Sequence, residues 1–119
     1  MFTFMQVLTT LVLRENKITD IGAQQLAEAL KTNQALTVLA LNENKITDSG
    51  AQQLADALKT NKVLTQIHLY GNQIGDNGAQ QLADSLKQNK TLTNLYLPKS
   101  ISAATQARLK QQDGRISFH

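Results

Sequence analysis

Residues 36–63 read LTVLALNENKITDSGAQQLADALKTNKV, and the rest of the chain is organised around this segment. A shift of 28 residues in either direction gives close copies, LTTLVLRENKITDIGAQQLAEALKTNQA at residues 8–35 and LTQIHLYGNQIGDNGAQQLADSLKQNKT at residues 64–91. A fourth copy begins at Leu92 and soon diverges. A fixed period of about 20 to 50 residues is typical of a solenoid, in which each unit buries its apolar side against its neighbours. The sequence therefore predicts a single repeat domain.

The period divides this domain into five parts. Residues 1–7 form an N-terminal stump. Three full repeats follow, at residues 8–35, 36–63 and 64–91, and residues 92–119 form a degenerate C-terminal capping repeat. In the capping repeat Ser100 replaces a recurring asparagine, and Pro98 lies at the exit of a predicted strand, where it cannot donate a sheet hydrogen bond. Residues 115–118 are suited to a short closing strand.

The N-terminal stump leaves the first repeat without a visible polar cap, although the terminal units of solenoids usually carry one. Phe2 and Phe4 fit three alternatives: the remainder of an earlier repeat, a hydrophobic plug over the open end, or a disordered start. The missing cap indicates a longer array, a partner at this end, or self-association through the N-terminal edge. The apolar run at residues 1–13 is too short to cross a bilayer and lacks a basic start, so we expect no membrane contact.

The composition fits a globular domain with an aliphatic core. The 119 residues are 41% hydrophobic but only 4% aromatic, so the core has to be built from many small apolar side chains. The absence of cysteine excludes disulfides and thiol nucleophiles and favours a cytoplasmic setting. The net charge is only +3, and the basic residues alternate with acids or lie on predicted helices, so nothing indicates nucleic-acid binding.

Within each repeat the spacing of apolar residues changes once. Leu11 and Leu13 alternate as in a strand with one buried face. Further on, the spacing i, i+3, i+4, i+7 indicates one apolar face of a helix, and in the first repeat these positions are Ala23, Leu26, Ala27 and Leu30. Each unit is therefore predicted to be one strand followed by one helix.

Polar residues mark both ends of the predicted helix. Asp20 stands where we expect the N-cap, and Asn33 follows the last turn, where asparagine tolerates the left-handed conformation. Both recur 28 and 56 residues further on, as Asp48, Asp76, Asn61 and Asn89.

The pattern LxxLxLxxNxI, followed by DxGAxxLAxAL, resembles a leucine-rich repeat of the ribonuclease-inhibitor-like type and is most similar to the repeats of NOD-like receptors. The resemblance covers residues 8–91 well and residues 92–112 loosely. It implies an α/β fold, a short curved solenoid of 28-residue β-α units with a parallel sheet on the concave side and helices on the convex side. The alternating cysteines of ribonuclease inhibitor are absent.

Asn16, Asn44 and Asn72 recur where the chain leaves each predicted strand, and the resemblance implies that they form a structural ladder. A buried asparagine side chain donates and accepts hydrogen bonds at once. It can therefore satisfy the peptide groups of a turn that is enclosed by the solenoid.

The copies disagree at the strand positions that point away from the leucines. These positions form three columns: Thr10, Val38, Gln66 and Asn94; Val12, Ala40, His68 and Tyr96; Arg14, Asn42, Tyr70 and Pro98. Positions that vary between repeats are where a solenoid determines its choice of partner. Neutral drift at exposed positions would give the same variation.

His68, Tyr70 and Tyr96 stand out in these columns. His68 and Tyr96 occupy one column on adjacent strands, roughly 5 Å apart. Tyrosine offers a large contact area with a polar tip, which suits an anchor for a partner, although such rings could equally shield the inner surface. We expect the partner-binding residues to be His68, Tyr70, Tyr96, Gln66, Asn94, Asn42 and Arg14.

These features predict a non-catalytic protein–protein interaction module for a protein or peptide partner. The two histidines, the recurring aspartates and the absence of metal-spaced ligands or a glycine-rich phosphate loop give catalysis little support, so no cofactor or metal is expected. We expect His119, the last residue, to be mobile.

Two alternatives stay open. The chain could be an enzyme regulator, a GTPase activator or an enzyme inhibitor, as the resemblance to ribonuclease-inhibitor-like solenoids implies, with Arg14 as the candidate residue. It could also be a bacterial effector that is secreted into a host cytoplasm and targets host proteins.

Overall fold

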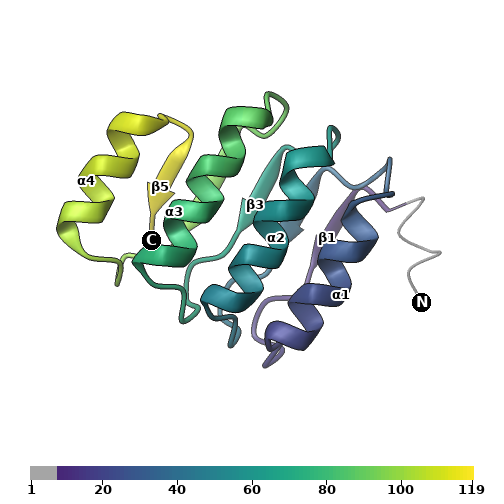
Figure 1. The fold of residues 1–119 in the computed structure, drawn as a ribbon. Coiled ribbons are helices and arrows are strands. Elements are labelled where there is room, and N and C mark those ends of the chain that lie inside the picture. Colours follow the sequence, from purple (N-terminus) through teal and green to yellow (C-terminus); the bar gives the residue numbers. More distant parts are fainter. Residues whose placement is uncertain (1–7) are drawn as a thin grey trace.

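The computed structural model describes residues 8–119 as two layers, a parallel sheet and a row of helices that covers one side of it (Figure 1). Within these residues the sheet has five strands in sequence order: β1 (Thr10–Val12), β2 (Val38–Ala40), β3 (Gln66–His68), β4 (Asn94–Leu97) and β5 (Ile116–Phe118). The helices are α1 (Asp20–Leu30), α2 (Asp48–Thr60), α3 (Asp76–Ser85) and α4 (Ala103–Gln112), and a short 3-10 helix, η2 (Leu86–Gln88), continues α3. This alternation of strand and helix confirms the predicted α/β solenoid. The Phe2 and Phe4 alternatives lie outside the described residues.

The repeat period sets the register of the sheet. Thr10 lies opposite Val38, Val38 opposite Gln66, and Gln66 opposite Asn94, each 28 residues further along the chain. Equivalent residues of successive repeats therefore stack in columns across the sheet. The closing strand β5 is present and also runs parallel to its neighbour, but it leaves the period, because Ile116 pairs with Leu95.

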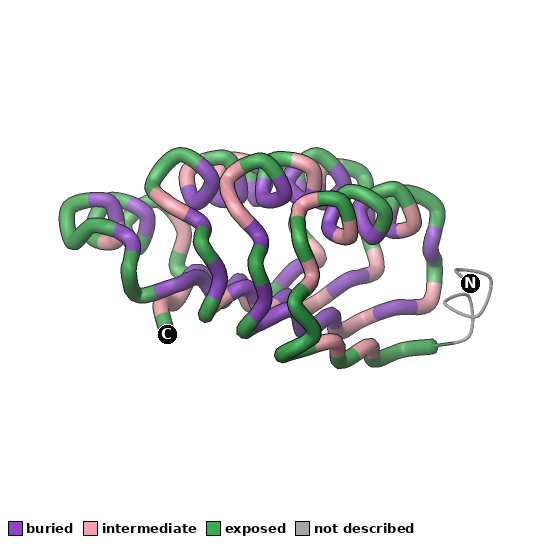
Figure 2. The backbone as a smooth tube through the Cα atoms, turned by 90° about the horizontal axis from the view of Figure 1, so that it is seen from below, coloured by how far each residue is buried: buried purple, intermediate pink, exposed green. Residues whose placement is uncertain are grey.

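The apolar core lies between the two layers, where buried segments of strand and helix face each other (Figure 2). From the sheet side Leu39, Ile67 and Leu95 are fully buried. From the helix side the buried residues of α1 are the four that the spacing predicts: Ala23, Leu26, Ala27 and Leu30. Complete burial of one such leucine contributes roughly 2 kcal/mol. Among the described residues, no helix is long and apolar enough to span a membrane.

The recurring aspartates do not cap their own helices, and that prediction was wrong. The N-cap residues of the first two helices are Thr19 and Thr47. The Asp20 carboxylate instead accepts hydrogen bonds from the backbone N–H groups of Thr47 at 2.8 Å and Gly50 at 3.1 Å, both in the next repeat. Asp48 and Asp76 likewise accept from the following repeat. An anion is favourable beside the N–H groups of a helix N-terminus, and here each aspartate serves the neighbouring helix.

The asparagines that follow the helices were expected to adopt the left-handed conformation, and that prediction was also wrong. Asn61 has φ −73° and is not left-handed, and the same holds for Asn89 at φ −122°. The buried Asn61 side chain accepts from the N–H groups of Val63 and Leu64 at 2.9 and 2.8 Å and donates to the carbonyl of Leu30 at 2.8 Å. These asparagines therefore form a second inter-repeat ladder.

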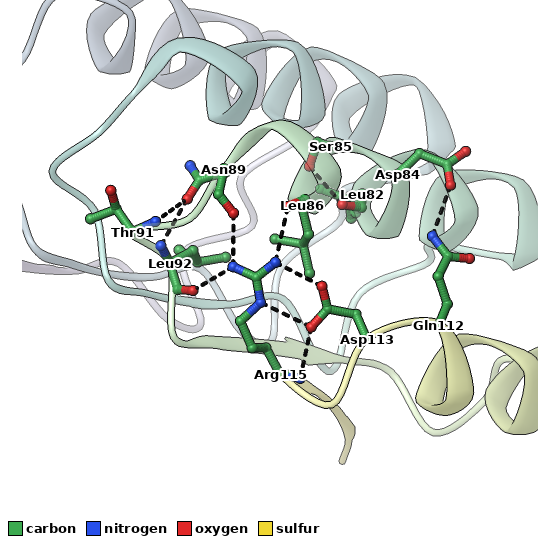
Figure 3. A network of polar contacts seen from close by, with 10 residues as sticks. All are labelled: Leu82, Asp84, Ser85, Leu86, Asn89, Thr91, Leu92, Gln112, Asp113 and Arg115. Carbon is green, nitrogen blue, oxygen red and sulfur yellow. Dashed lines mark hydrogen bonds and ion pairs between the residues drawn. The ribbon is translucent and has the colours of Figure 1, made fainter.

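Arg115 continues this second ladder into the last unit (Figure 3). The Asn89 amide donates to the carbonyl oxygens of Leu58 and Asn61. The Arg115 guanidinium donates to the carbonyl oxygens 28 residues further on, those of Leu86 at 2.9 Å and Asn89 at 2.8 Å. An arginine from the closing segment thus takes the place that an asparagine holds in the regular repeats.

Asp113 holds this arginine in position. Its carboxylate accepts from the guanidinium at 2.7 and 2.9 Å, and these bonds lower the pKa of Asp113 against the opposing effect of burial. The guanidinium also donates to the carbonyl of Leu92 at 2.8 Å, so the segment before β5, the loop before β4 and η2 are tied together.

Candidate functional site

The concave sheet face consists of the strand side chains that point away from the helices. Its central column pairs Val12 with Ala40, Ala40 with His68, and His68 with Tyr96. The fifth strand extends this column, because Ser117 pairs with Tyr96. Small or aliphatic side chains lie at the β1 end of the column and aromatic side chains lie at the β4 end, so the face changes character along the solenoid.

The structure brings together the three aromatic residues that the sequence singled out. The His68 ring stacks on the Tyr96 ring, with centroids 4.4 Å apart and planes inclined by 23°. Tyr70, at the exit of β3, lies 6.2 Å from His68 in a tilted arrangement. All three side chains are half-buried, so they pack on one another and still present surface. Packing of this kind lowers the entropic cost of holding an anchor in place for a partner.

His119 joins the same group, which the sequence did not predict. Its ring lies 5.3 Å from Tyr96 and 5.8 Å from Tyr70. Its backbone N–H donates to the carbonyl of Leu97 at 2.9 Å and its main-chain oxygen accepts from Lys99 at 2.9 Å, so backbone bonding to the neighbouring strand continues beyond β5. We call His68, Tyr70, Tyr96 and His119 the aromatic cluster. The alternation in the final residues, Ile116 inward and Ser117 outward, was the only signal for this placement.

The aromatic cluster disfavours positive charge at His68. Partial burial of the ring, and repulsion between the two imidazoles when both carry a proton, lower the pKa of His68 below its ordinary value. Both effects penalise the charged form. The environment of the cluster thus favours the neutral form of His68.

The polar residues expected around the cluster divide into two groups. Gln66 and Asn94 pair across β3 and β4 and are half-buried beside the rings, as a rim would require. Asn42 was expected in the same rim, but only 5% of it is exposed, so it offers a partner almost no surface. The equivalent residue Arg14 is exposed and Tyr70 is half-buried, so strand alternation alone does not account for the burial of Asn42.

Arg14 lies apart from the aromatic cluster. It is exposed and follows β1, two strands away from Tyr70 in the same column, which corresponds to roughly 10 Å at the spacing of a sheet. The structure therefore does not bring Arg14 together with the rings.

The first asparagine ladder lies beside the concave face and is part of the scaffold. The Asn44 side chain accepts from the backbone N–H groups of Asn16 and Ile18, both at 2.9 Å, and donates to the carbonyl groups of Leu13 and Leu41. Asn72 makes equivalent bonds one repeat later. Asn16 differs, because its exposed side chain donates only to the carbonyl of its near neighbour Arg14.

The described residues contain no group of three or more histidine, cysteine, aspartate or glutamate side chains that could hold a metal ion. The recurring aspartates Asp20, Asp48 and Asp76 are engaged in bonds between units. The arrangement of the concave face therefore offers contact surface and hydrogen-bonding tips, and its most distinctive feature is the aromatic cluster.

Comparison with known proteins gives a family and a fold. A family model described as Leucine Rich repeat matches residues 4–27, 32–55 and 60–83. The chain is similar to a solved structure of Leiomodin-1 Actin-Binding Site 2, with a TM-score of 0.86 and 22% identity over 99% of this chain and 76% of that chain. It is also similar to the tropomodulin C-terminal domain of Caenorhabditis elegans, with a TM-score of 0.72 and 18% identity over 87% of this chain and 64% of that chain. No curated protein matches the sequence.

Proposed function

The chain belongs to the leucine-rich repeat family, and on that premise we propose that its concave sheet face binds a protein or peptide partner without catalysing a reaction. The observation that carries this proposal is the aromatic cluster, in which four rings from three neighbouring strands and their exits pack together on one face. Tyrosine is enriched among the residues that dominate binding energy at interfaces. The rings are already packed against one another, so little side-chain freedom is lost when a partner binds.

The size of the concave face favours a peptide or a short segment of a protein. Five strands of three or four residues cover roughly 20 Å by 13 Å at the usual strand spacing and rise. This is about a third of the roughly 800 Å² that each partner contributes to a standard protein–protein interface. We therefore propose that the central strands receive an extended segment, and that a larger partner would also contact the turns.

Within the family we propose the ribonuclease-inhibitor-like type, with repeats at residues 8–35, 36–63 and 64–91, a capping repeat at residues 92–119, and a cytoplasmic location. The 28-residue offset between paired strands and the full helix in each unit support this assignment. The absence of cysteine is compatible with a reducing compartment.

Actin is the first folded partner to test, because the name of one similar structure identifies it as an actin-binding site of leiomodin-1. Calorimetric titration of monomeric actin into this chain measures the interaction directly. We expect heat of binding with the native chain and none with the Tyr70→Ala/Tyr96→Ala variant. No heat with the native chain would remove actin from the proposal.

The binding face itself is tested with peptides selected against the native chain from a displayed random library. The double variant Tyr70→Ala/Tyr96→Ala should lower the affinity for selected peptides at least tenfold, since loss of a dominant interface tyrosine commonly costs more than the roughly 1.4 kcal/mol that a tenfold change represents. The matched control is Gln24→Ala/Gln25→Ala, which alters two exposed residues of α1 on the helix side. Equal affinity for all three proteins would contradict the proposed function.

The first repeat also carries exposed apolar side chains, through which we propose self-association. The exposed large hydrophobic residues of the described chain are Leu8, Val12 and Ile21, all in this repeat, with exposed fractions of 39%, 56% and 71%. The residues equivalent to Ile21 are the polar Ser49 and Asn77. Light scattering over a concentration series should show a growing oligomer that Ile21→Ser weakens. A monomer at every concentration would refute this contact.

A further inference from the structure

Both histidines of the chain lie in the aromatic cluster, although they come from distant parts of the sequence. His68 ends β3, and His119 follows β5, which leaves the repeat period to reach this place. Histidine is the residue whose ordinary pKa lies closest to physiological pH. Two of them on one small surface can make the properties of that surface depend on pH. A pH dependence of partner binding there rests on the proposed binding function of the same surface.

The two imidazoles share the same tyrosine neighbours. The His68 and His119 ring centroids lie 4.4 and 5.3 Å from the Tyr96 ring, and 6.2 and 5.8 Å from the Tyr70 ring. Neutral imidazoles pack on tyrosine as ordinary aromatic rings. Two imidazolium ions placed around the same two rings repel each other, and the half-buried His68 ring also loses part of its hydration.

The described strand neighbours of His68 carry no negatively charged side chain. On the β2 side its paired neighbour is Ala40, and on the β4 side it is Tyr96. Its own strand continues to Tyr70, and beyond β4 lie Ser117 and His119. Repulsion from His119 therefore adds to partial burial in lowering the pKa of His68.

The charged side chains of the neighbouring turns are Glu43, after β2, and Lys99, after β4. Among the described residues, neither forms an ion pair or a hydrogen bond with an imidazole, and the ring of His119 interacts through its Nε2 with Ser117 Oγ at 3.1 Å. Among the described residues, no side-chain carboxylate forms an ion pair with either imidazole.

We propose that His68 and His119 act as a coupled, pH-sensitive pair that keeps the aromatic cluster assembled when both are neutral and loosens it when both are protonated. The backbone of His119 closes the last strand through its bonds to Leu97 and Lys99, so displacement of its ring also loosens the end of β5. Partner affinity at the cluster consequently falls as the pH drops below the ordinary histidine range.

The coupling can be tested without any partner by following the imidazole signals of the full chain by NMR from about pH 8 to pH 5. In the His119→Gln variant the pKa of His68 should rise toward its ordinary value, because the repulsion is gone while the burial remains. His119 is exposed, so this variant should keep the fold, which circular dichroism checks. An unchanged titration of His68 in His119→Gln would overturn the proposed pair.

The effect on binding is measured with one library-selected peptide at about pH 7.5 and pH 5.5, on either side of the ordinary histidine pKa. The native chain should lose about tenfold in affinity, and His68→Gln/His119→Gln should lose much less. Peptide binding that depends on the tyrosines but not on pH would refute the switch and leave the proposed function intact. Selected peptides whose affinity does not depend on the tyrosines would refute the proposed function. The partner-free titration would still show whether the protonation of His68 depends on His119.

Discussion

Asn44 and Asn16 occupy equivalent positions and experience different surroundings. Asn44 is buried between the first two repeats and bonds to backbone groups of both. Asn16, in the first repeat, is exposed and bonds only to the carbonyl of Arg14 through its side chain. The contribution of one ladder residue should therefore depend on whether a preceding repeat covers it.

Replacement of Asn44 by alanine should lower the free energy of unfolding by about 1–3 kcal/mol, because several buried peptide groups lose their partners. Urea denaturation monitored by circular dichroism measures this loss. Asn16→Ala is the matched control and should change stability by less than about 0.5 kcal/mol. Equal losses in the two variants would contradict the ladder as described.

At the scale of elements, the last unit bonds to the preceding one through Arg115, where the regular repeats use an asparagine. Arg115 donates to the carbonyl oxygens of Leu86, Asn89 and Leu92, and Asp113 neutralises its charge. These carbonyl groups belong to the end of α3, its 3-10 extension and the loop to β4. Arg115 therefore closes the solenoid at β5 and supports the strand that brings His119 to the aromatic cluster.

Arg115→Met keeps much of the side-chain volume but removes every one of these bonds. It should cost about 2–4 kcal/mol of stability, the range expected when a partly buried charged partner is lost. Arg108→Met is the control, because Arg108 is exposed on α4 and bonds mainly to the side chain of Gln80. If thermal melts show that both variants lose the same small amount, Arg115 does not act as a cap.

The carboxylates that join neighbouring units make stability depend on pH. Hydrogen bonds from Thr47 and Gly50 lower the pKa of Asp20 despite the opposing effect of burial, and bonds from Arg115 lower the pKa of Asp113. Below the ordinary aspartate pKa of 3.8 the unfolded chain therefore binds more protons than the folded chain. The stability that these groups provide is present above that pH and is lost as the pH falls through the lowered values.

Melting temperatures recorded from about pH 6 down to pH 2.5 should consequently fall most steeply below the ordinary aspartate pKa. Asp20→Asn should reduce the steepness of this fall, because asparagine keeps the shape and cannot ionise. His68, whose pKa is also lowered, adds a loss that begins as the pH falls below the ordinary histidine value of 6.5. A melting temperature that does not change over the acidic range would contradict the assigned bonds.

For the molecule as a whole, the apolar face that repeats every 28 residues could be predicted, whereas contacts between units and the placement of the C-terminal residues could not. The buried stripe of α1, with Leu26 and Leu30, follows from spacing alone because every unit repeats it. Arg115 and His119 flank β5, a strand that pairs outside the period, so no earlier copy indicates their places. The burial of Asn42 and the inter-repeat bonds of Asp20 depend on how one unit meets the next, which spacing within a unit does not reveal.

The central claim is that partner recognition occurs at the aromatic cluster on the concave face rather than on the helices. The most direct test is to titrate a library-selected peptide into the isotope-labelled chain and to map the changes in its amide NMR signals. The account predicts that the largest changes cluster at Gln66, His68, Asn94, Tyr96 and His119, with little change along α1 to α4. Largest changes on the helices or at the exposed hydrophobic residues of the first repeat would contradict it.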